Sequence, residues 1–564
     1  MLSLFTSSVC VVQRTMIAAL LTIILAAPVA NAVAPQAPQE SGKVSKEPVA
    51  VFTIASLDGF LRDVNHLSTI SGMPQAGAML NLYVGAYSQG VDKSQPLGVV
   101  VRMIDGVPAP MLFVAIADVK GVLKNLEPQF GAAEELDDGT MVMQAGQNLV
   151  YIRDQGDWAF LANDRSALAD LPNDPKSMLQ GLHKEHDIGI RANLQQIPEA
   201  MRMGLIQQMR QAFDDAVKRM AERNGGQVQP QPTNEAAIKQ LELLMRDSEY
   251  LTLGITIDAE KNELAIDMAS TAIEGSKLAQ MYNDRKPIPS KFADFIRPDA
   301  TFYMHAAATT GKQEQETSLE SIDQSLKQLR DLIGQSVEVS ESDAEKIEQY
   351  LPRVKDLLKA NVRSGKINGG LIGLTENNQL RVLLGGSVTD GRKIEQLVKD
   401  IYGEFDGNPD APQFTFDAEV YKGMTLHRGT LAIPSKAAEL RKMFGEQLSI
   451  VIATSDDRLL VGAGEDSEAL LKQFVDSKAV APNDLPLSQG SISLLPALQY
   501  AYWVNENSVT DTLLKTLQRN PENDEVRFVQ PVEPNGQRIR LTIDDGVLQV
   551  IGAAAQAGRQ RPEF

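Results

Sequence analysis

The chain has 564 residues, of which 43% are hydrophobic and 23% are charged, as in a folded globular protein and unlike a disordered one. This length suits two to four domains with a large buried core. The formal net charge of −19 argues against unspecific binding to nucleic acid, which needs a basic surface, and against docking on anionic membranes.

The N-terminus has the pattern of a secretory signal peptide over residues 1–32. The apolar run Met16–Ala27 follows the single charge of Arg14, and it is short for a membrane-spanning helix. The small-x-small pattern that ends at Ala32 predicts cleavage before Val33. The alternative is an uncleaved N-terminal anchor. We therefore expect a periplasmic or secreted protein, with no integral membrane span in the mature chain.

Cysteine usage fits this expectation. Cys10 is the only cysteine, and it lies inside the predicted signal peptide. The mature chain would lack disulfides, thiolate chemistry and cysteine-based zinc sites. Residues 33–49 are rich in Pro, Gln, Ser and Lys, so a flexible linker is expected there.

Beyond the linker, one order of predicted elements recurs: a strand, two helices, a strand pair and a closing helix. The order is clearest at 187–284 and 299–404, whose closing segments "EGSKLAQM" and "DGRKIEQL" align. It also fits 50–128 and 491–555. In the last of these units, "IRLTIDDGVLQVIGAA" is expected to form a hairpin around Asp544, Asp545 and Gly546.

These units combine into a predicted domain organisation. Two halves, 50–284 and 299–555, each contain a unit, a spacer and a second unit. Residues 285–298 are expected to link the halves, and 556–564 to form a flexible tail. The predicted fold class is α+β, with duplicated halves whose antiparallel sheets carry helices on one face.

The stretch "VGAGEDSEAL" raises the possibility of a dinucleotide-binding turn, because Gly462 and Gly464 have the spacing of such a turn. The third position of the G-x-G-x-x-G/A motif does not match, because Ser467 stands where glycine or alanine is needed. The first-half counterpart, "WAFLANDRSAL", has no glycine. We therefore predict a structural turn in both halves, with Asp164 and Asp466 near a helix start as N-caps.

The histidines offer weak metal signals. His183 and His186 have i,i+3 spacing, but no third ligand follows at a recognisable spacing, so a surface loop is predicted. His305 lies on a predicted strand and is expected to be buried and hydrogen-bonded.

Other catalytic patterns are missing. No G-x-S-x-G motif, P-loop or calcium loop occurs in the sequence. Methionines 201, 209 and 220 share a helical face with Phe213 and Val217, which predicts core packing rather than a soft ligand groove. No catalytic, cofactor-binding or metal-ligating residue is assigned.

The strings "QPLGVVVRM", "FVAIADVKGVLKNL", "GDWAFLA" and "DIGIRANLQQIPEAMR" resemble uncharacterised exported proteins of planctomycete-type bacteria. The resemblance covers mainly Val51 to about Ala307. It implies export and the repeated architecture, and it brings no activity.

The sequence therefore favours an exported soluble envelope protein with a binding or scaffolding role and without catalysis or cofactors. The alternative is a binder of an apolar ligand or unfolded polypeptide, in a groove between helices and sheet. A further alternative is a hydrolase whose site the sequence does not reveal. A protein or an apolar ligand is the expected kind of partner.

Overall fold

The computed structural model describes residues 47–145, 148–223, 233–335, 341–404, 412–477 and 485–559. The predicted signal peptide, Cys10 and most of the predicted linker lie outside these residues. The chain divides into two compact units, Met1–Leu278 and Ala279–Phe564. Each unit is a mixture of helices and an antiparallel sheet, so the α+β class is confirmed.

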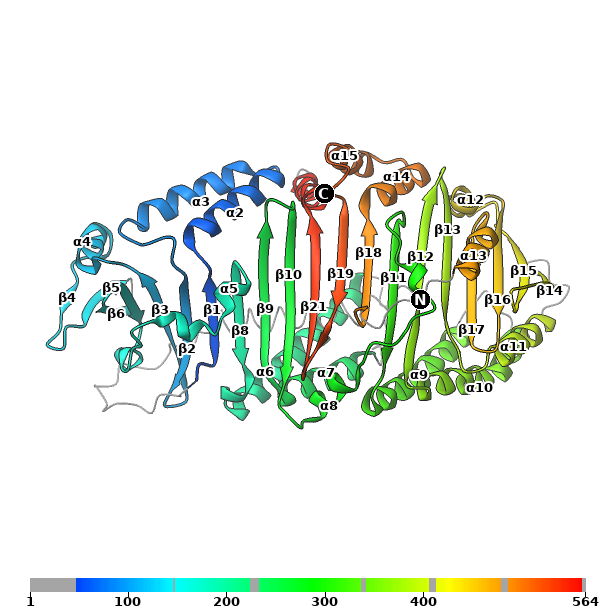
Figure 1. Ribbon diagram of the computed structural model, residues 1–564, viewed down its shortest axis with the longest axis horizontal. Coiled ribbons are helices and arrows are strands. Elements are labelled where there is room, and N and C mark those ends of the chain that lie inside the picture. The colour runs from blue at the N-terminus through cyan, green and yellow to red at the C-terminus, as the bar shows by residue number, and fades with distance from the viewer. Residues whose placement is uncertain are drawn as a thin grey trace. The chain divides into compact units, whose positions relative to one another are not determined.

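Unit 1 begins with a strand and a helix pair and repeats that order near its end (Figure 1). Its strands are β1 (Ala50–Ile54), β2 (Leu97–Ile104), β3 (Val107–Ala115), β4 (Glu134–Glu135), β5 (Met141–Ala145), β6 (Asn148–Gln155), β7 (Trp158–Ala162), β8 (Ile188–Asn193), β9 (Ser248–Asp258) and β10 (Glu263–Ala272). Its helices are α2 (Leu57–Ile70), α3 (Pro74–Tyr87), α4 (Val119–Phe130), α5 (Leu182–Glu185), α6 (Glu199–Arg223), α7 (Thr233–Asp247) and α8 (Lys277–Asp284), the last of which crosses the unit boundary. Short 3₁₀ turns are η1 (Arg165–Leu168), η2 (Pro175–Leu179) and η3 (Leu194–Gln196).

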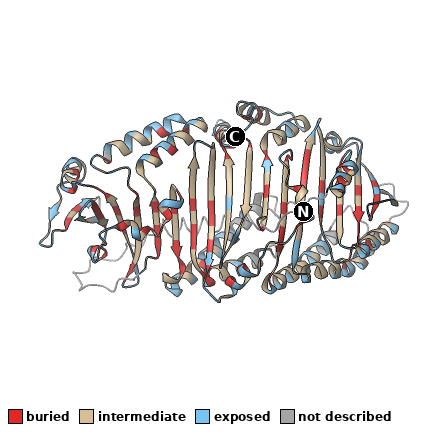
Figure 2. Cartoon of the chain, viewed as in Figure 1, coloured by how far each residue is buried: buried red, intermediate tan, exposed pale blue. Residues whose placement is uncertain are grey.

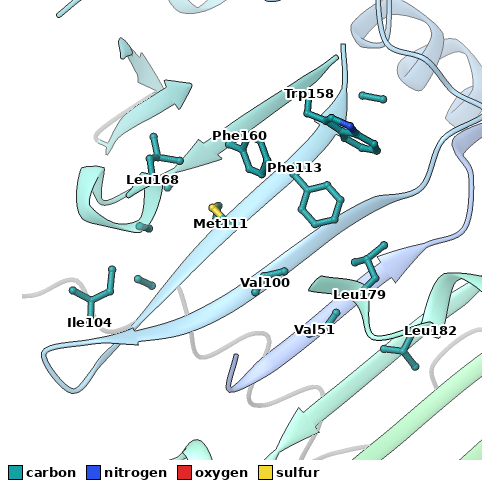
Figure 3. Packing of buried hydrophobic residues seen from close by; sticks show 14 residues of the cluster. Val51, Val100, Ile104, Met111, Phe113, Trp158, Phe160, Leu168, Leu179 and Leu182 are labelled. Atoms are coloured by element: carbon teal, nitrogen blue, oxygen red, sulfur yellow. The ribbon is translucent and has the colours of Figure 1, made fainter. Parts of the chain in front are cut away.

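The sheet of unit 1 has the strand order β4-β5-β6-β7-β3-β2-β1-β8-β9-β10, with antiparallel pairing throughout. One face of its middle carries Val51, Val100 and Phe113, all buried. Leu179 of η2 and Leu182 of α5 pack on these side chains (Figure 3). We call this side the covered face of unit 1.

Unit 2 contains the second set of elements (Figure 1). Its strands are β11 (Phe302–Thr309), β12 (Lys366–Glu376), β13 (Gln379–Ser387), β14 (Gln413–Tyr421), β15 (Met424–Ala432), β16 (Gln447–Thr454), β17 (Arg458–Ala463), β18 (Ser488–Ser493), β19 (Glu525–Gln530), β20 (Val532–Glu533) and β21 (Gly536–Asp544). Its helices are η4 (Ala293–Phe295), α9 (Lys312–Gln335), α10 (Glu341–Arg363), α11 (Gly391–Gly403), α12 (Ala438–Phe444), α13 (Ser467–Asp476), α14 (Leu494–Val504), α15 (Ser508–Leu517) and α16 (Asp545–Arg559).

The sheet of unit 2 has the order β14-β15-β16-β17-β13-β12-β11-β18-β19-β21, again antiparallel, and β20 pairs with β21. Its covered face carries Leu383 and Leu460, on which Leu470 of α13 packs. Phe292 and Phe295 complete this core, with their rings stacked at 6.2 Å. Residues 285–298, expected as a linker, therefore supply two of the largest buried side chains of unit 2.

The expected hairpin around Asp544, Asp545 and Gly546 is wrong. Strand β21 ends at Asp544 and helix α16 starts at Asp545. Val547 and Val550 are both buried, which is the i,i+3 spacing of a helix, and alanines follow that favour helix. The strand partner of β21 is β19, which lies before it in the chain.

The helices do not keep to one face of the sheet, as the sequence had suggested. In unit 2, α13 packs on the covered face, whereas α11 bonds to Thr425 and Thr454, whose side chains point to the opposite face. The reason is that both faces of these strands carry apolar side chains that need cover. No described helix is both long and apolar enough to cross a membrane.

Candidate functional site

The side of the unit 2 sheet opposite the covered face carries apolar side chains from strand to strand. Because directly opposed residues of antiparallel strands point to the same side, the strand register defines rows across the sheet. One row is Ile450, Ala463, Val382, Gly373, Phe302, Ile492, Val526 and Ile543. The next is Ile452, Val461, Leu384, Leu371, Met304, Gly490, Phe528 and Leu541. We call this side the open face of unit 2.

Exposure separates the two faces. On the open face, Ile367, Leu384 and Ile492 are 50%, 40% and 39% exposed, although they lie within the sheet. In strands β19 and β21 almost every position is half-buried on both faces alike, so the difference in exposure is confined to the other strands (Figure 2). Scattered exposed leucines are normal, but contiguous apolar rows of this kind mark an interaction surface.

Three phenylalanines lie over glycines on this face. Phe302 is the cross-strand partner of Gly373, and Phe528 is that of Gly490. A side chain at either glycine would overlap the phenylalanine ring, and Phe414 covers Gly429 in the same way. The glycines therefore let the phenylalanine rings lie flat against the sheet. We call the apolar surface that the rows of an open face form the floor of that unit.

Unit 1 has a corresponding open face. Its row is Met141, Ile152, Leu161, Leu112, Val99, Phe52, Ile190, Leu253 and Met268. The positions from Leu161 to Leu253 in this row are half-buried. The same alternation thus leaves an apolar floor in each unit.

Helix pairs border the floor of unit 1. Ile206 of α6 and Met245 of α7 pack on Leu251, which lies on the open face at one end of the strands. At the other end a groove of about 290 Å³ is lined by Val114 of the floor and by Leu57, Tyr83, Val84, Ser88 and Val91. The pairs α2–α3 and α6–α7 lie at opposite strand ends (Figure 1), so they flank the floor.

Helix α3 is unusual for a surface helix. Its sequence, "PQAGAMLNLYVGAY", has no charged residue, and Leu82 is 75% exposed, with Met79 and Tyr83 also exposed. Tyr83 lines the groove. The part of the border that α3 forms is therefore apolar as well.

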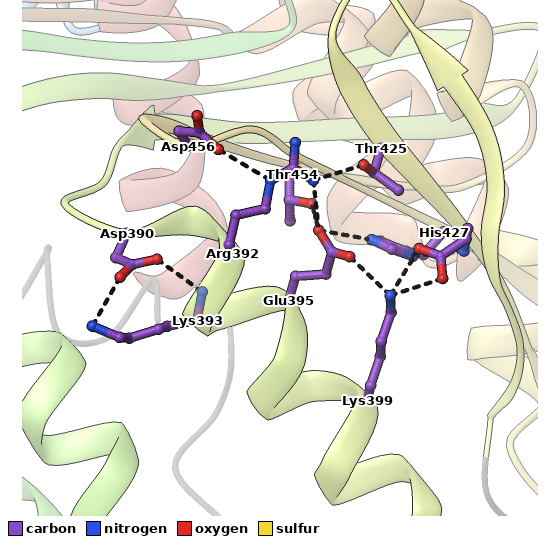
Figure 4. Close-up of polar contacts among 10 residues, drawn as sticks. Asp390, Arg392, Lys393, Glu395, Lys399, Thr425, His427, Thr454 and Asp456 are labelled. Atoms are coloured by element: carbon purple, nitrogen blue, oxygen red, sulfur yellow. Dashed lines mark hydrogen bonds and ion pairs between the residues drawn. The ribbon is translucent and has the colours of Figure 1, made fainter.

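Helix α11 closes one end of the open face in unit 2 through a cluster of charges (Figure 4). The Lys399 ammonium donates to Glu395 at 2.8 Å and to both carboxylate oxygens of Asp417 at 2.8 and 2.9 Å. The Thr454 hydroxyl donates to Glu395 at 2.7 Å. His427, only 2% exposed, lies beneath them.

The protonation states follow from these contacts. Burial raises the pKa of Glu395, but the bonds from Lys399 and Thr454 outweigh burial and hold that pKa at about 2. Burial lowers the pKa of Lys399, and the bonds to Asp417 and Glu395 again reverse the direction. Burial lowers the pKa of His427, so its ring is neutral at pH 7.

Among the described residues, Glu395, Asp417 and His427 are the group whose ligand atoms lie close enough for a metal, within 4.8 Å of one another. Two features oppose a metal. The Lys399 ammonium already bridges the two carboxylates. The Asp417 backbone N–H donates to Nδ1 of His427 at 3.1 Å, which leaves the ring proton on Nε2, where a metal would bind. The cluster thus carries its own cation.

The structure places His305 at 0% exposure, with Nε2 bonded to the Ser290 hydroxyl at 2.8 Å. The pair resembles a nucleophile and base, yet Ser290 donates to Asn368 at 2.8 Å and is itself buried. The histidine is therefore the donor in the pair, and it does not activate the serine.

His183 and His186 do not form a ligand pair. His186 is 4% exposed, with Gly254 against its ring, so the expected surface loop is wrong for this residue. The loop that carries His186 packs against strand β9 because Gly254 leaves room for the His186 ring.

On α6, Met201 is exposed and Ile206 is buried. The side chains of Phe213, Val217 and Met220 lie outside those described. The structure therefore describes only part of the helical face that carries Met201, Met209 and Met220. The exposed Met201 does not fit the predicted core packing.

Gly462 and Gly464 pack tightly. A side chain at Gly464, whose φ is 103°, would overlap the Leu380 carbonyl, and one at Gly462 would crowd Val451. Asp164 caps η1 by accepting from Ser166, whereas Asp466 precedes α13 without a side-chain cap bond. Asp466 thus lies at the start of α13, as predicted, but the expected side-chain cap is wrong, and its backbone is left-handed with a φ of 55°.

Comparison with protein-family models, with curated proteins and with solved structures found no match, so the function rests on the geometry. Sequence reasoning missed both the open faces and the α11 cluster. The register that assembles them is not local, although the runs "LGVVVRM" and "MLFVAIA" signal strands with two apolar faces.

His305 predicts a pH dependence of stability. Burial lowers its pKa from 6.5 to about 4 in the folded chain. Between these values the unfolded chain binds a proton that the folded chain does not, so stability falls as the pH drops from about 6.5 to 4. The loss approaches about 3 kcal/mol. In denaturant titrations at both ends of this range, His305→Gln should show a smaller loss than the wild type. An equal loss in both proteins would contradict this assignment.

Proposed function

We propose that the protein is an exported, non-catalytic binding protein that holds an apolar ligand on the open faces of its sheets. The observation that carries the proposal is the pair of apolar rows on the open face of unit 2, with Leu384 and Ile492 left exposed. Each Å² of apolar surface removed from water is worth about 25 cal/mol, which favours any ligand that covers the floor.

The arrangement supports a receptor more than an enzyme. Enzymatic acid–base chemistry needs titratable groups that converge on a substrate position. The α11 cluster places titratable groups beside the open face of unit 2, and there Lys399 neutralises Glu395 and Asp417. The floor itself supplies apolar contact area and shape.

We also propose that the two units arose by duplication of one α+β half. The support is their strand orders, which correspond position by position: β4-β5-β6-β7-β3-β2-β1-β8-β9-β10 and β14-β15-β16-β17-β13-β12-β11-β18-β19-β21. Four times, a strand, a helix pair, two strands and a helix follow each other, and α16 supplies the closing helix of the last set. Two unrelated halves have no physical reason to share this connectivity.

Export remains part of the proposal, on the strength of residues 1–32. N-terminal sequencing of the envelope fraction should start at or within a few residues of Val33. An intact Met1 on cytoplasmic protein would refute export.

The duplication predicts that residues 50–278 and 299–559 superpose strand for strand. An experimental structure of the full chain tests this prediction by Cα superposition of the two units. A different strand order in either unit would refute the common origin.

The binding proposal predicts that a charge on the floor abolishes binding of an apolar probe. In wild-type protein, bis-ANS fluorescence should rise on binding, and Leu384→Glu should weaken the affinity at least tenfold, because a carboxylate on the floor must be desolvated. Leu149→Glu on β6 is the matched control, since Leu149 is an exposed leucine (49%) that points to the side of the unit 1 sheet opposite its open face. Equal weakening by both variants, or none by Leu384→Glu, would contradict the proposal.

A further inference from the structure

Resting on the proposed function, the geometry points to one ligand class: we propose that the open faces hold the hydrocarbon chains of a membrane lipid. The choice lies between hydrocarbon, an extended polypeptide, an amphipathic helix and a second copy of this chain. Four observations separate them.

The floor offers no hydrogen-bonding partner to a polypeptide. Strands β13, β12, β11 and β18 are each paired on both sides, so their backbone groups are engaged within the sheet. Side chains such as Leu371, Met304 and Phe528 have no polar group to offer. An extended peptide lying on this floor would leave its own N–H and C=O groups unpaired, and a hydrocarbon chain has none.

Two of the flanking helices, α3 and α14, disfavour an amphipathic helix. Neither α3 nor α14, "LLPALQYAYWV", contains a charged residue. Helix α14 contacts β12, and α3 lines the groove beside the floor of unit 1. Along α3 and α14 an amphipathic helix would set its polar side against an uncharged helix, whereas a hydrocarbon chain is apolar around its whole circumference.

The floor has a suitable length. From β17 to β21 there are six steps between strands: β17–β13, β13–β12, β12–β11, β11–β18, β18–β19 and β19–β21. At about 4.8 Å a step the row spans about 29 Å. The hydrocarbon core of a bilayer is about 30 Å thick for two lipid layers, so a single lipid chain fits within the row.

A second copy of the chain is disfavoured in unit 1. Two sheets pack face to face at about 10 Å. The pairs α2–α3 and α6–α7 border the floor at both strand ends, and a helix is itself about 10 Å across. These helices would hold another sheet away from the floor, while a single chain lies between them.

The polar end of the open face selects no charged headgroup. In the α11 cluster, Lys399 is bound to Glu395 and Asp417, and Arg392 is bound to Glu395 and Asp456. Both cations are thus paired with carboxylates. Affinity should depend on the length of the hydrocarbon chain and hardly on the charge of its head.

The test is displacement of bis-ANS from the full mature chain by lauric, myristic and palmitic acids and by their uncharged methyl esters. We expect the affinity to rise about fourfold for each added methylene, equally for acids and esters and with little effect of salt. Leu384→Glu and the milder Ile492→Ser should both weaken palmitate binding, and Leu149→Glu should not. Circular dichroism confirms that each variant is folded.

Phospholipid vesicles with pyrene-labelled acyl chains distinguish the source of the chain. Transfer of pyrene lipid from the vesicles to the protein supports a membrane lipid. Binding of a triacylated lipopeptide without transfer of phospholipid would overturn that source. If bis-ANS binds at the open face but fatty acids do not displace it, and an amphipathic leucine–lysine helical peptide does, hydrocarbon chains are refuted while the proposed binding function stands. If Leu384→Glu leaves bis-ANS binding intact, both proposals fail.

Discussion

The two-residue alternation of antiparallel strands is the constraint on which this structure depends. Strands such as β2, β13 and β16 carry apolar side chains at both odd and even positions, so both faces of the sheet are apolar there. Phe292, Phe295 and α13 bury one face of the sheet in unit 2, and η2 and α5 do the same in unit 1. Among the described residues, the opposite face is covered at its edges, by helices such as α4, α6, α7 and α11. Its middle keeps large apolar side chains in contact with solvent.

Apolar side chains in contact with water cost free energy. The cross-strand pairs of phenylalanine with glycine indicate how the structure limits the exposed apolar area. Each ring lies over a glycine on the neighbouring strand, so it covers backbone and stays low on the sheet. The charges of the α11 cluster are confined to the edge, where Lys399 satisfies Glu395 and Asp417 together. A floor kept apolar beside a neutralised polar edge suits hydrocarbon, and we propose that the ligand covers the side chains that the described residues leave exposed.

The local pattern of apolar residues was sufficient to predict the order of strands and helices. Apolar residues recur every second position in a strand and about every 3.6 positions in a helix, and both periods can be read within a short segment. The local pattern gave a wrong prediction where the same residues are compatible with both a turn and a helix. "DDG" is a good turn, but the residues after it, Val547 and Val550, have helical spacing, and α16 forms instead. It also failed where burial depends on distant partners. His186 is buried because Gly254, 68 positions later, leaves space for its ring. His427 and Glu395 meet only when α11 packs on β15 and β16. The open faces need the complete register, which no single segment encodes.

The central claim is that the ligand lies along the open rows. Photolabelling with a palmitate that carries a diazirine near the end of its chain, followed by peptide mapping, tests this directly. The account predicts labels on the strands that carry Phe302, Leu384, Ile492 and Phe528, and their loss when excess palmitate competes. Labels confined to the covered-face segments around Leu179 or Phe295, or spread without competition over the surface, would contradict it.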